Sequence, residues 1–390
     1  MRVLSVVGTR PEAVKMAPVI RALSQEPGVE SRVCITAQHR QMLDQVLDLF
    51  QIRPEYDLDL MREDQSLPEL SASIFLGLDP VLQAFAPDWV LVEGDTTTVA
   101  ITALLAYYRR LRLGHVEAGL RTHNKWQPFP EELNRRFAAV AADLHFAPTE
   151  QARQNLLHEG VDPRLIVVTG NPVIDALQFV VDQPEPESIR QLLDRLHVAV
   201  GSTRGQRHVT AAAGSGGSRA SALLLVTAHR RENFGAPLES ICAALKDLAA
   251  RGDVEIVYPV HLNPNVQEPV QRLLGNVAHI TLLPPLDYLP LVHLMKHAAV
   301  ILTDSGGIQE EAPAFGTPVL VLREVTERPE GIEAGTLRLV GTDRNRIVAQ
   351  ASLLLDDPAA YAQMAKAANP FGDGHAAERI VRALLSFQGQ

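Results

Sequence analysis

Residues 299–311 read AVILTDSGGIQEE, an apolar run that leads into a glycine-containing turn and a polar segment. The apolar residues 299–302 predict the end of a buried strand, and Asp304 and Ser305 are residue types that favour the N-cap of a helix. The glycine pair that follows carries no side chains, so a ligand can approach the backbone N–H groups at the positive end of the helix. This strand–turn–helix order is typical of an α/β sheet, and the turn suits a phosphate group.

The two carboxylates in this stretch suit a different part of a ligand. Glu310 or Glu311 next to a phosphate would repel it, so one of them is expected to face hydroxyl groups such as those of a ribose. The alternative is an ordinary Ser-Gly-Gly turn followed by solvated acids, because glycine-containing turns are common.

Outward from this stretch, short β-rich runs alternate with segments of helical period along the whole chain. Strands are predicted at 2–8, 32–37, 88–95, 112–119, 143–148, 222–229, 254–261, 278–283, 299–305 and 318–323. Helical spacing of apolar residues lies between them, for example at 12–25, 38–50, 96–110 and 131–142. This alternation predicts an α/β fold of two Rossmann-like, doubly wound domains that face a cleft.

The predicted domains are 1–170 and 171–373, because Gly170 and Pro172 interrupt the pattern within 169–177. A terminal helix at 374–390 is expected to pack back across both domains. Residues 198–221 are poor in large apolar side chains and rich in Gly, Ser and Ala, and this segment is expected to be a flexible surface insertion.

Composition limits the classes of function. The chain has 390 residues and a formal net charge of −10, which argues against a general nucleic-acid or membrane surface. Its only two cysteines, Cys34 and Cys242, are too few for a disulfide framework or a zinc site, so a reduced, cytoplasmic setting is expected. The N-terminal run reads as a strand rather than a signal peptide, and no apolar run reaches the roughly 18 residues that span a bilayer.

Cationic residues follow two of the predicted strands. In open α/β sheets, ligands lie beyond the carboxyl ends of the strands. GTRPEAVK (8–15) places Arg10 and Lys15 there, beside a glycine turn that lacks the GxGxxG pattern of dinucleotide sites. VTAHRREN (226–233) brings His229 to the corresponding place in the second domain. These groups can bind a diphosphate, and solvated loop charges and a structural histidine are the alternatives.

Three carboxylates follow other strands of the first domain. Asp95 lies in VEGDTTT (92–98), Glu117 in VEAGLRT (116–122) and Glu131 in PFPEELNRR (128–136). Asp95 could instead cap a helix, but three carboxylates that converge are typical of acid–base catalysis. His293 and His297 have i, i+4 spacing but lack a third ligand motif, so no metal site is predicted.

Together these motifs resemble the bacterial non-hydrolysing UDP-N-acetylglucosamine 2-epimerases. The motifs that carry the resemblance run in order from about residue 3 to 385, and they are GTRPEAVK, TAQHRQMLDQVLDLF, EGDTTTV, GHVEAGLRT, PFPEELNR, VTAHRREN, TDSGGIQEEAPAFGTPVLVLR, TERPEGIEAGT and NPFGDG. The segment 198–221 is the main departure, and it lies between motifs. The resemblance implies a GT-B-like fold, a homodimer, and action on UDP-GlcNAc and UDP-ManNAc for polysaccharide biosynthesis, with no NAD and no metal.

The resemblance also assigns residues. The active cleft is expected to contain Arg10, Lys15, Asp95, Glu117, Glu131 and His229, and UDP to be bound by Ser305, Gly306, Gly307, Glu311 and Arg328. Leu286 and Leu291 match a loop beside the uracil, where some relatives carry Gln and Phe. Gln38, His39, Gln41 and Gln65 match a second UDP-GlcNAc site, at which the substrate acts as an activator.

The reaction that the resemblance implies is elimination of UDP to a 2-acetamidoglucal, followed by re-addition with the opposite configuration at C2. The sequence leaves open which carboxylate serves which face of C2. It also leaves three other readings: a GT-B glycosyltransferase that needs an acceptor, a hydrolysing 2-epimerase that releases free ManNAc, and a nucleotide-sugar sensor without turnover.

Overall fold

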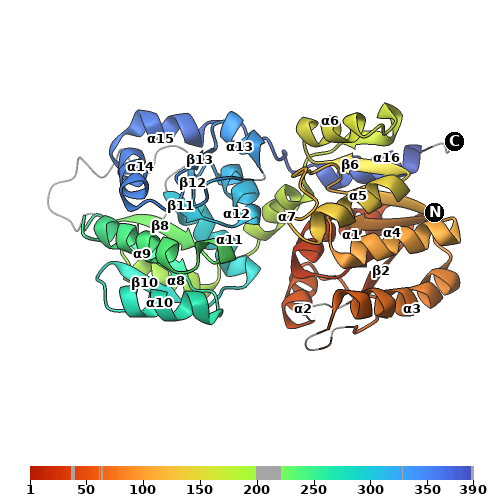
Figure 1. The fold of residues 1–390 in the computed structure, drawn as a ribbon, viewed down its shortest axis with the longest axis horizontal. Coiled ribbons are helices and arrows are strands. Elements are labelled where there is room, and N and C mark those ends of the chain that lie inside the picture. Colours follow the sequence, from red (N-terminus) through yellow and green to blue (C-terminus); the bar gives the residue numbers. More distant parts are fainter. Residues whose placement is uncertain (37–39, 61, 63–64, 199–220, 327, 388–390) are drawn as a thin grey trace. The chain divides into compact units, whose positions relative to one another are not determined.

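A computed structural model describes residues 1–36, 40–60, 62, 65–198, 221–326 and 328–387. The chain divides into two compact units, one made of Met1–Gln178 with Phe371–Gln390 and the other of Phe179–Pro370. The sequence placed this division at 170 and set the segment 374–390 apart. In the structure the C-terminal helix α16 (Ala376–Ser386), coloured blue in Figure 1, lies among the elements of the first unit and packs on α1 (Arg10–Gln25).

The first unit is built on a seven-stranded parallel sheet. Its strands are β1 (Arg2–Val7), β2 (Glu30–Ile35), β3 (Tyr56–Asp57), β4 (Trp89–Glu93), β5 (Arg112–Val116), β6 (Leu144–Ala147) and β7 (Ile166–Val168). They are ordered β3-β2-β1-β4-β5-β6-β7, which is the doubly wound Rossmann order with one added strand. The remaining helices are α2 (Arg40–Leu49), α3 (Leu67–Phe85), α4 (Thr97–Arg109), α5 (Glu131–Ala141), α6 (Glu150–His158), a 3-10 turn (Pro163–Leu165) and α7 (Pro172–Val181).

Strand β1 lies in the middle of this sheet, paired with β2 on one side and β4 on the other. Leu4 and Val6 point to one face, where they pack with residues of α3 and α4, and Val3 and Val7 are fully buried on the other face. A strand that is apolar on both faces is expected in a covered parallel sheet.

The second unit repeats the architecture with six parallel strands. They are β8 (Ala222–Thr227), β9 (Val254–Pro259), β10 (Ile280–Leu283), β11 (Val300–Thr303), β12 (Val319–Val321) and β13 (Leu337–Leu339), in the order β10-β9-β8-β11-β12-β13. The helices are α8 (Glu187–Arg195), α9 (Ala236–Ala249), α10 (Pro264–Leu274), α11 (Tyr288–His297), α12 (Gly306–Glu311), α13 (Pro329–Glu333), α14 (Arg344–Asp356) and α15 (Pro358–Ala365), with 3-10 turns at Arg231–Asn233 and Ala312–Phe315.

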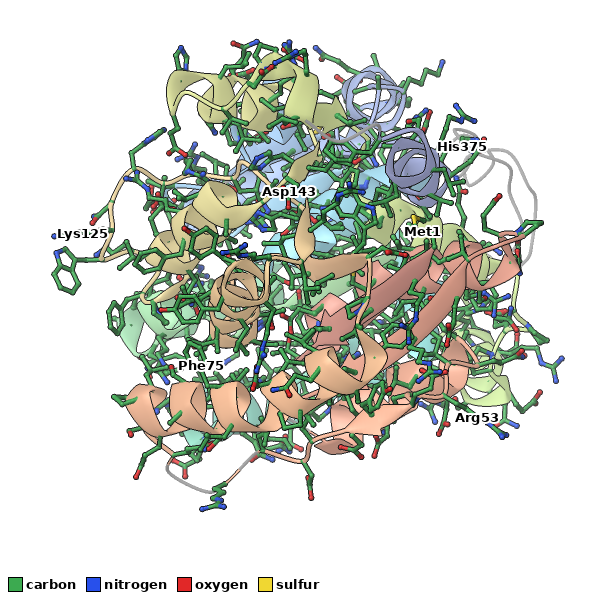
Figure 2. All side chains as sticks on the ribbon, turned by 90° about the vertical axis from the view of Figure 1, so that its right-hand side faces the viewer. Met1, Arg53, Phe75, Lys125, Asp143 and His375 are labelled. Carbon is green, nitrogen blue, oxygen red and sulfur yellow. The ribbon has the colours of Figure 1, made fainter. Side chains whose placement is uncertain are left out.

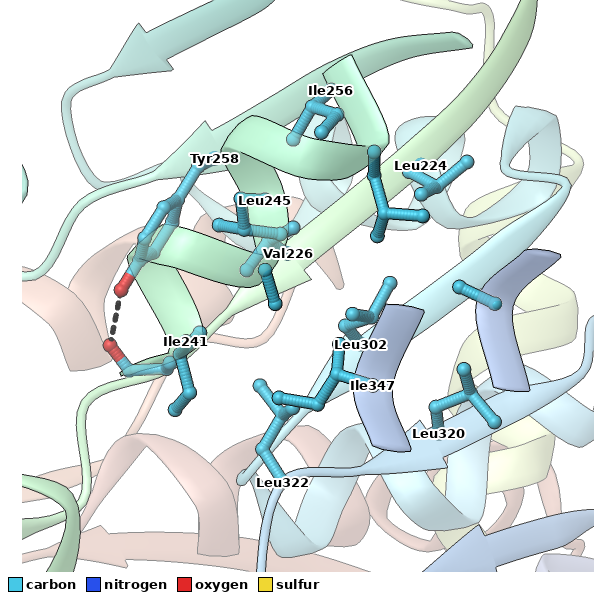
Figure 3. Close-up of a cluster of buried hydrophobic side chains, with 14 of the residues drawn as sticks. Leu224, Val226, Ile241, Leu245, Ile256, Tyr258, Leu302, Leu320, Leu322 and Ile347 are labelled. Atoms are coloured by element: carbon cyan, nitrogen blue, oxygen red, sulfur yellow. Dashed lines mark hydrogen bonds between the residues drawn. The ribbon is translucent and has the colours of Figure 1, made fainter. Parts of the chain in front are cut away.

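The core of the second unit supports the end of its first strand. Figure 3 shows side chains of β8, β9, β11 and β12 packed around Leu245 of α9 and Ile347 of α14. Tyr258 lies in this cluster, and its hydroxyl donates a 2.7 Å hydrogen bond to the main-chain carbonyl of Ala228 (Figure 3). This bond anchors the backbone directly before His229.

The predicted fold class is therefore confirmed, with two α/β units of Rossmann strand order. All ten predicted strands are present, with ends that differ by one or two residues in most cases. Three short strands, β3, β7 and β13, were not predicted. They contain two or three residues each, too few for an alternation of apolar and polar side chains to be recognised.

Candidate active site

Lys15 and Glu117 are in direct contact in the first unit. The Lys15 ammonium donates to Glu117 Oε2 and lies 3.1 Å from Glu93 Oε1. Asn171, at the turn before α7, donates from Nδ2 to the same Glu117 oxygen over 2.7 Å. The side chains of Lys15, Glu93 and Glu117 are largely buried. Electrostatic interactions are stronger in the protein interior than in water.

The backbone of Glu117 has an unusual conformation. Its φ is +59°, in the left-handed region that non-glycine residues seldom adopt. Two residues later Gly119 has φ +94°, and a Cβ there would lie 2.2 Å from the carbonyl oxygen of Ala152. The backbone of the turn after β5 is therefore strained, and this turn carries the Glu117 carboxylate that contacts Lys15. Backbone strain of this kind is often found at functional sites.

Glu12 is a third buried carboxyl group in this region, and it joins two loops that follow strands. Its Oε2 accepts a 2.9 Å hydrogen bond from the main-chain N–H of Gly8, and its Oε1 accepts one of 2.7 Å from the Thr96 hydroxyl. Burial raises the pKa of Glu12 to about 7, although these hydrogen bonds oppose the shift. Glu12 therefore links the loop before Arg10 to the loop that contains Asp95.

Asp95 forms an ion pair with Arg135 of α5. It does not cap α4, because the N-cap is Thr96, whose hydroxyl accepts from the Val99 main-chain N–H. The capping alternative for Asp95 is therefore wrong. Arg135 also lies 3.4 Å from Glu132, which is fully buried.

Glu131 is the first residue of α5 and is half-buried. Its Oε2 is buried and has no hydrogen-bond partner among the residues that the structure describes. The neighbouring Glu132 instead holds the preceding loop, accepting from the main-chain N–H groups of Thr122 and His123. This loop protrudes from the ribbon at Lys125 (Figure 2). The three predicted carboxylates thus have three different surroundings, and Glu117 is the one paired with Lys15.

In the second unit, Asp304 organises the loop that contains His229. The Asp304 side chain is fully buried, and its Oδ2 accepts hydrogen bonds from the main-chain N–H groups of His229 and Arg230, both 2.8 Å, and from Asn233 Nδ2, 2.9 Å. The sequence predicted that Asp304 caps a helix. This prediction is wrong, because the carboxylate accepts hydrogen bonds from the turn after β8 instead.

The imidazole of His229 is half-buried and stacks on His261, with ring centroids 5.4 Å apart and an interplanar angle of 12°. Its Nδ1 lies 3.4 Å from Asp304 Oδ1. Burial lowers the pKa of His229, Asp304 opposes this, and Arg230 and His261 add to it. The ring is therefore biased toward the neutral form, in which it can accept a proton or donate a hydrogen bond.

The turn that contains Gly306 and Gly307 lies against the side chain of Arg328. Ser305 is the N-cap of α12, as the sequence predicted, and its main-chain N–H donates to the Thr303 hydroxyl over 2.9 Å. A Cβ at Gly306 would lie 3.0 Å from the guanidinium carbon of Arg328, so Gly306 makes room for this cation. Arg328 Nε in turn donates to Glu310 Oε1 over 2.8 Å.

Both glutamates of this turn are buried. Glu310 pairs with Arg328, and Glu311 lies beside the second glycine, since a Cβ at Gly307 would be 3.4 Å from Glu311 Oε1. Leu286 precedes α11 and Leu291 lies within it, and both are half-buried.

The predicted activator residues are only partly described. Gln38, His39 and the side chain of Gln41 lie outside the described residues, as do residues 199–220 of the predicted insertion. Gln65 is described: its Nε2 donates to the Ser73 hydroxyl over 3.4 Å, and its buried Oε1 has no hydrogen-bond partner among the described residues.

Several residues of these sites were missed by sequence reasoning. They are Glu12, Glu93, Arg135, Asn171 and, in its observed role, Asp304. For Glu93 a signal existed, because a carboxylate ends the otherwise apolar strand WVLVE. No local signal existed for Asn171 or Arg135, since their partners are distant in the sequence.

Within the described part of the chain, no group of three or more His, Cys, Asp or Glu side chains could hold a metal ion. A search of the described helices also finds none that is long and apolar enough to span a membrane.

Comparisons with known proteins cover almost the entire chain. The UDP-N-acetylglucosamine 2-epimerase family model matches residues 21–385. A UDP-N-acetylglucosamine 2-epimerase of Yersinia pestis is 53% identical over 390 residues, which are 100% of this chain and 99% of that protein. The enzyme of the same name from Escherichia coli K12 is 53% identical over 386 residues, 98% of each chain.

Comparison with solved structures points to the same family. The crystal structure of UDP-GlcNAc 2-epimerase from Neisseria meningitidis, bound to UDP-GlcNAc, matches with a TM-score of 0.87 and 46% identity, covering 99% of this chain and 100% of that one. The predicted GT-B-like class of the fold is confirmed. The chain belongs to the UDP-N-acetylglucosamine 2-epimerase family.

Proposed function

We propose that this protein is a non-hydrolysing isomerase that interconverts UDP-GlcNAc and UDP-ManNAc by inverting C2. The observation that carries the proposal is the buried contact of Lys15 with Glu117, held by Asn171, in a chain that matches the 2-epimerase family over nearly its whole length. A carboxylate fixed in this way can act on a carbon-bound proton, and an ammonium group beside it can stabilise a leaving diphosphate.

The chemistry explains why both kinds of group are needed. No carbonyl is adjacent to C2 of an N-acetyl sugar, so its proton is not acidic. In the proposed reaction the C1–O bond to UDP breaks, the C2 proton is removed, and a C1=C2 double bond forms in a 2-acetamidoglucal. Re-addition of UDP at C1 and of a proton to the opposite face of C2 gives the epimer.

We assign the proton transfers to Asp95, Glu117 and Glu131. We assign stabilisation of the leaving UDP to the hydrogen-bond donors Arg10, Lys15 and His229. Support comes from Glu117, held beside Lys15, and from the buried oxygen of Glu131, which has no hydrogen-bond partner among the described residues and can accept a proton.

We assign UDP binding to the second unit. The proposed residues are Leu286, Leu291, Ser305, Gly306, Gly307, Glu311 and Arg328. In support, the Arg328 guanidinium lies against Gly306, and a guanidinium at a glycine turn suits a diphosphate. Glu311, a buried carboxylate beside Gly307, suits the ribose hydroxyls.

We further propose that UDP-GlcNAc is an activator as well as a substrate, at a second site formed by Gln38, His39, Gln41 and Gln65. The support is the family resemblance of the TAQHRQMLDQ segment, together with the buried carbonyl oxygen of Gln65, which has no hydrogen-bond partner within the described part of the chain. A buried amide oxygen of this kind is expected to find a donor in a ligand.

A homodimer is also proposed, and the surface of the first unit supports it. Helices α4 and α5 pack together and expose an α4–α5 patch made of Leu104, Tyr107, Leu133, Phe137 and Val140. Val140 is 89% exposed and Tyr107 69%. Large apolar side chains exposed on two packed helices suit burial against a second copy. A monomer mass in light scattering of the purified protein would contradict this.

We place the reaction in the cytoplasm. Cys34 and Cys242 are both buried free thiols, and burial raises the pKa of Cys34 to about 12 and of Cys242 to about 11. Unpaired thiols are compatible with a reducing compartment, where nucleotide sugars are made and used.

The decisive experiment is to incubate the purified protein with UDP-GlcNAc alone and follow the anomeric signals by NMR. Appearance of UDP-ManNAc until an equilibrium mixture is reached supports the proposal. Release of free ManNAc and UDP would indicate a hydrolysing epimerase. Binding without any product would leave a glycosyltransferase or a sensor, which an acceptor sugar would separate.

A further inference from the structure

The side chain of Glu93 is a buried acid that the proposed chemistry does not use. Glu93 is the last residue of β4, follows the fully buried Val90, Leu91 and Val92, and is itself 2% exposed. Its Oε1 lies 3.1 Å from the Lys15 ammonium. An acid in this place destabilises the fold unless it is paired or protonated, so its presence calls for an explanation.

The Lys15 ammonium is shared between two carboxyl groups. It contacts Glu117 directly and Glu93 at 3.1 Å, so the two acids compete for one positive charge. Asn171 donates a further hydrogen bond to Glu117 but not, among the described contacts, to Glu93. Hydrogen bonds to the charged form favour ionisation, so Glu117 is the better site for the negative charge and Glu93 the better site for a proton.

The ionisable groups that bear on Glu93 come from several elements. Helix α1 contributes Lys15 and Glu12, and the turn after β5 contributes Glu117. On β5, His115 lies nearby, with Nε2 2.7 Å from the Gly94 carbonyl oxygen, and burial lowers its pKa to about 4, so it adds no charge near neutral pH. The charges of Glu117 and Glu12 therefore act on Glu93 against the single positive charge of Lys15. Burial, together with Glu117 and Glu12, raises the pKa of Glu93 well above its usual value, and Lys15 opposes this.

We propose that Glu93 is a positioning residue for the epimerisation: it shares the Lys15 ammonium with Glu117, and its ionisation sets how strong a base Glu117 is. When Glu93 is ionised, it shares Lys15 and adds a like charge close to Glu117, which makes Glu117 a stronger base. When Glu93 is protonated, Lys15 pairs fully with Glu117 and weakens it as a base. Glu93 itself does not touch the substrate in this proposal, which rests on the proposed function.

The test compares the pH dependence of kcat for UDP-GlcNAc in the native protein and in Glu93→Gln. The amide keeps the size of the side chain but cannot ionise. Glu117 ionises first, while Glu93 still holds its proton, so we expect the lower acidic limb to stay in Glu93→Gln. A further rise of kcat at higher pH, where Glu93 ionises and makes Glu117 a stronger base, should be lost, with KM little changed. Glu93→Asp can still ionise and should keep this second rise. Glu239→Gln, an exposed residue of the second unit, is the control and should leave the profile unchanged.

A second measurement does not depend on activity. The carbonyl stretch of protonated carboxyl groups is followed by infrared difference titration of the unliganded protein between about pH 5 and 9. The titrating band should lose amplitude in Glu93→Gln and keep it in Glu239→Gln. A native profile without the second rise of kcat, a second rise that persists in a folded Glu93→Gln variant, or an unchanged infrared band overturns the proposal for Glu93. Absence of turnover in the native protein would overturn the proposed function instead, and the infrared result would still decide whether Glu93 holds the proton.

Discussion

Asp304 fixes the position of His229 through the main chain. Its Oδ2 accepts a 2.8 Å hydrogen bond from the His229 N–H, and its Oδ1 lies 3.4 Å from the imidazole Nδ1. The same oxygen Oδ2 also accepts from Arg230 and Asn233, so one buried charge orders the whole turn after β8. These bonds hold the main chain at His229 in one conformation.

In the Asp304→Asn variant, the turn after β8 should be less ordered, and His229 should lose the nearby negative charge that raises its pKa. Asp304 raises the pKa of His229, so its neutralisation should lower that pKa further. We expect turnover to fall by on the order of ten-fold. The pKa is measured by NMR titration of the imidazole signals. Asp343→Asn, which alters a helix cap elsewhere in the second unit, is the control. A His229 pKa that stays constant or rises in Asp304→Asn would show that the carboxylate does not act on the ring.

Substitution of the three carboxylates should separate chemistry from folding. Asp95→Asn, Glu117→Gln and Glu131→Gln should each reduce turnover by on the order of 100-fold or more, because each removes a group that can transfer a proton. Circular dichroism should show that the variants remain folded, and Glu150→Gln on the surface should retain activity. Near-normal rates in all three variants would eliminate the acid–base assignment.

The fate of the C2 hydrogen distinguishes elimination from oxidation. In deuterated water, the product should contain deuterium at C2, because the proton that is returned need not be the one that was removed. Prolonged incubation should also release some free 2-acetamidoglucal and UDP. Mass spectrometry and NMR of the product measure both. Full retention of the original C2 hydrogen would point to oxidation elsewhere on the ring and to a bound nicotinamide.

Glu12 should make stability depend on pH. Its pKa in the folded protein is about 7, above the usual value of 4.5, so the folded state holds the proton more strongly than the unfolded chain. The resulting stabilisation is fully present below about pH 4.5 and is lost as the pH rises through 7, with a total on the order of 3 kcal/mol. Glu12→Gln should flatten this part of the profile.

The comparison is made by denaturant unfolding of the native protein and Glu12→Gln at pH values on both sides of 7. The amide can still accept from the Gly8 N–H and can donate to the Thr96 hydroxyl oxygen, so the two loops stay joined. Parallel stability profiles for the two proteins would mean that Glu12 does not carry the proton.

Activation is tested in the reverse direction. With UDP-ManNAc alone, turnover should begin slowly and accelerate when traces of UDP-GlcNAc are added, since an activator shifts the population toward the competent state. Gln41→Ala and Gln65→Ala should weaken this acceleration while leaving the carboxylates in place. Linear progress curves that added UDP-GlcNAc does not change would show that the regulatory site is absent.

The architecture could be predicted from the sequence because its determinants are local. Apolar runs of four to six residues, such as those of β1 and β8, alternate with segments of helical period, and this alternation admits few topologies. The strand-end rule then placed Lys15 and Glu117 at the same edge of one sheet, and the structure joins them in direct contact. Short strands such as β3 carried too few residues to be recognised.

Tertiary structure alone decided the partners of each charged group. Lys15 is 102 residues from Glu117 in the sequence, Asp304 is 75 from His229, and Asp95 is 40 from Arg135. A local pattern cannot show which distant side chain will neutralise a buried charge. For this reason Asp304 was expected to cap its own helix but instead orders the neighbouring turn. The sequence thus determined which residue types lie at the strand ends, and the fold determined how burial and pairing divide protons among them.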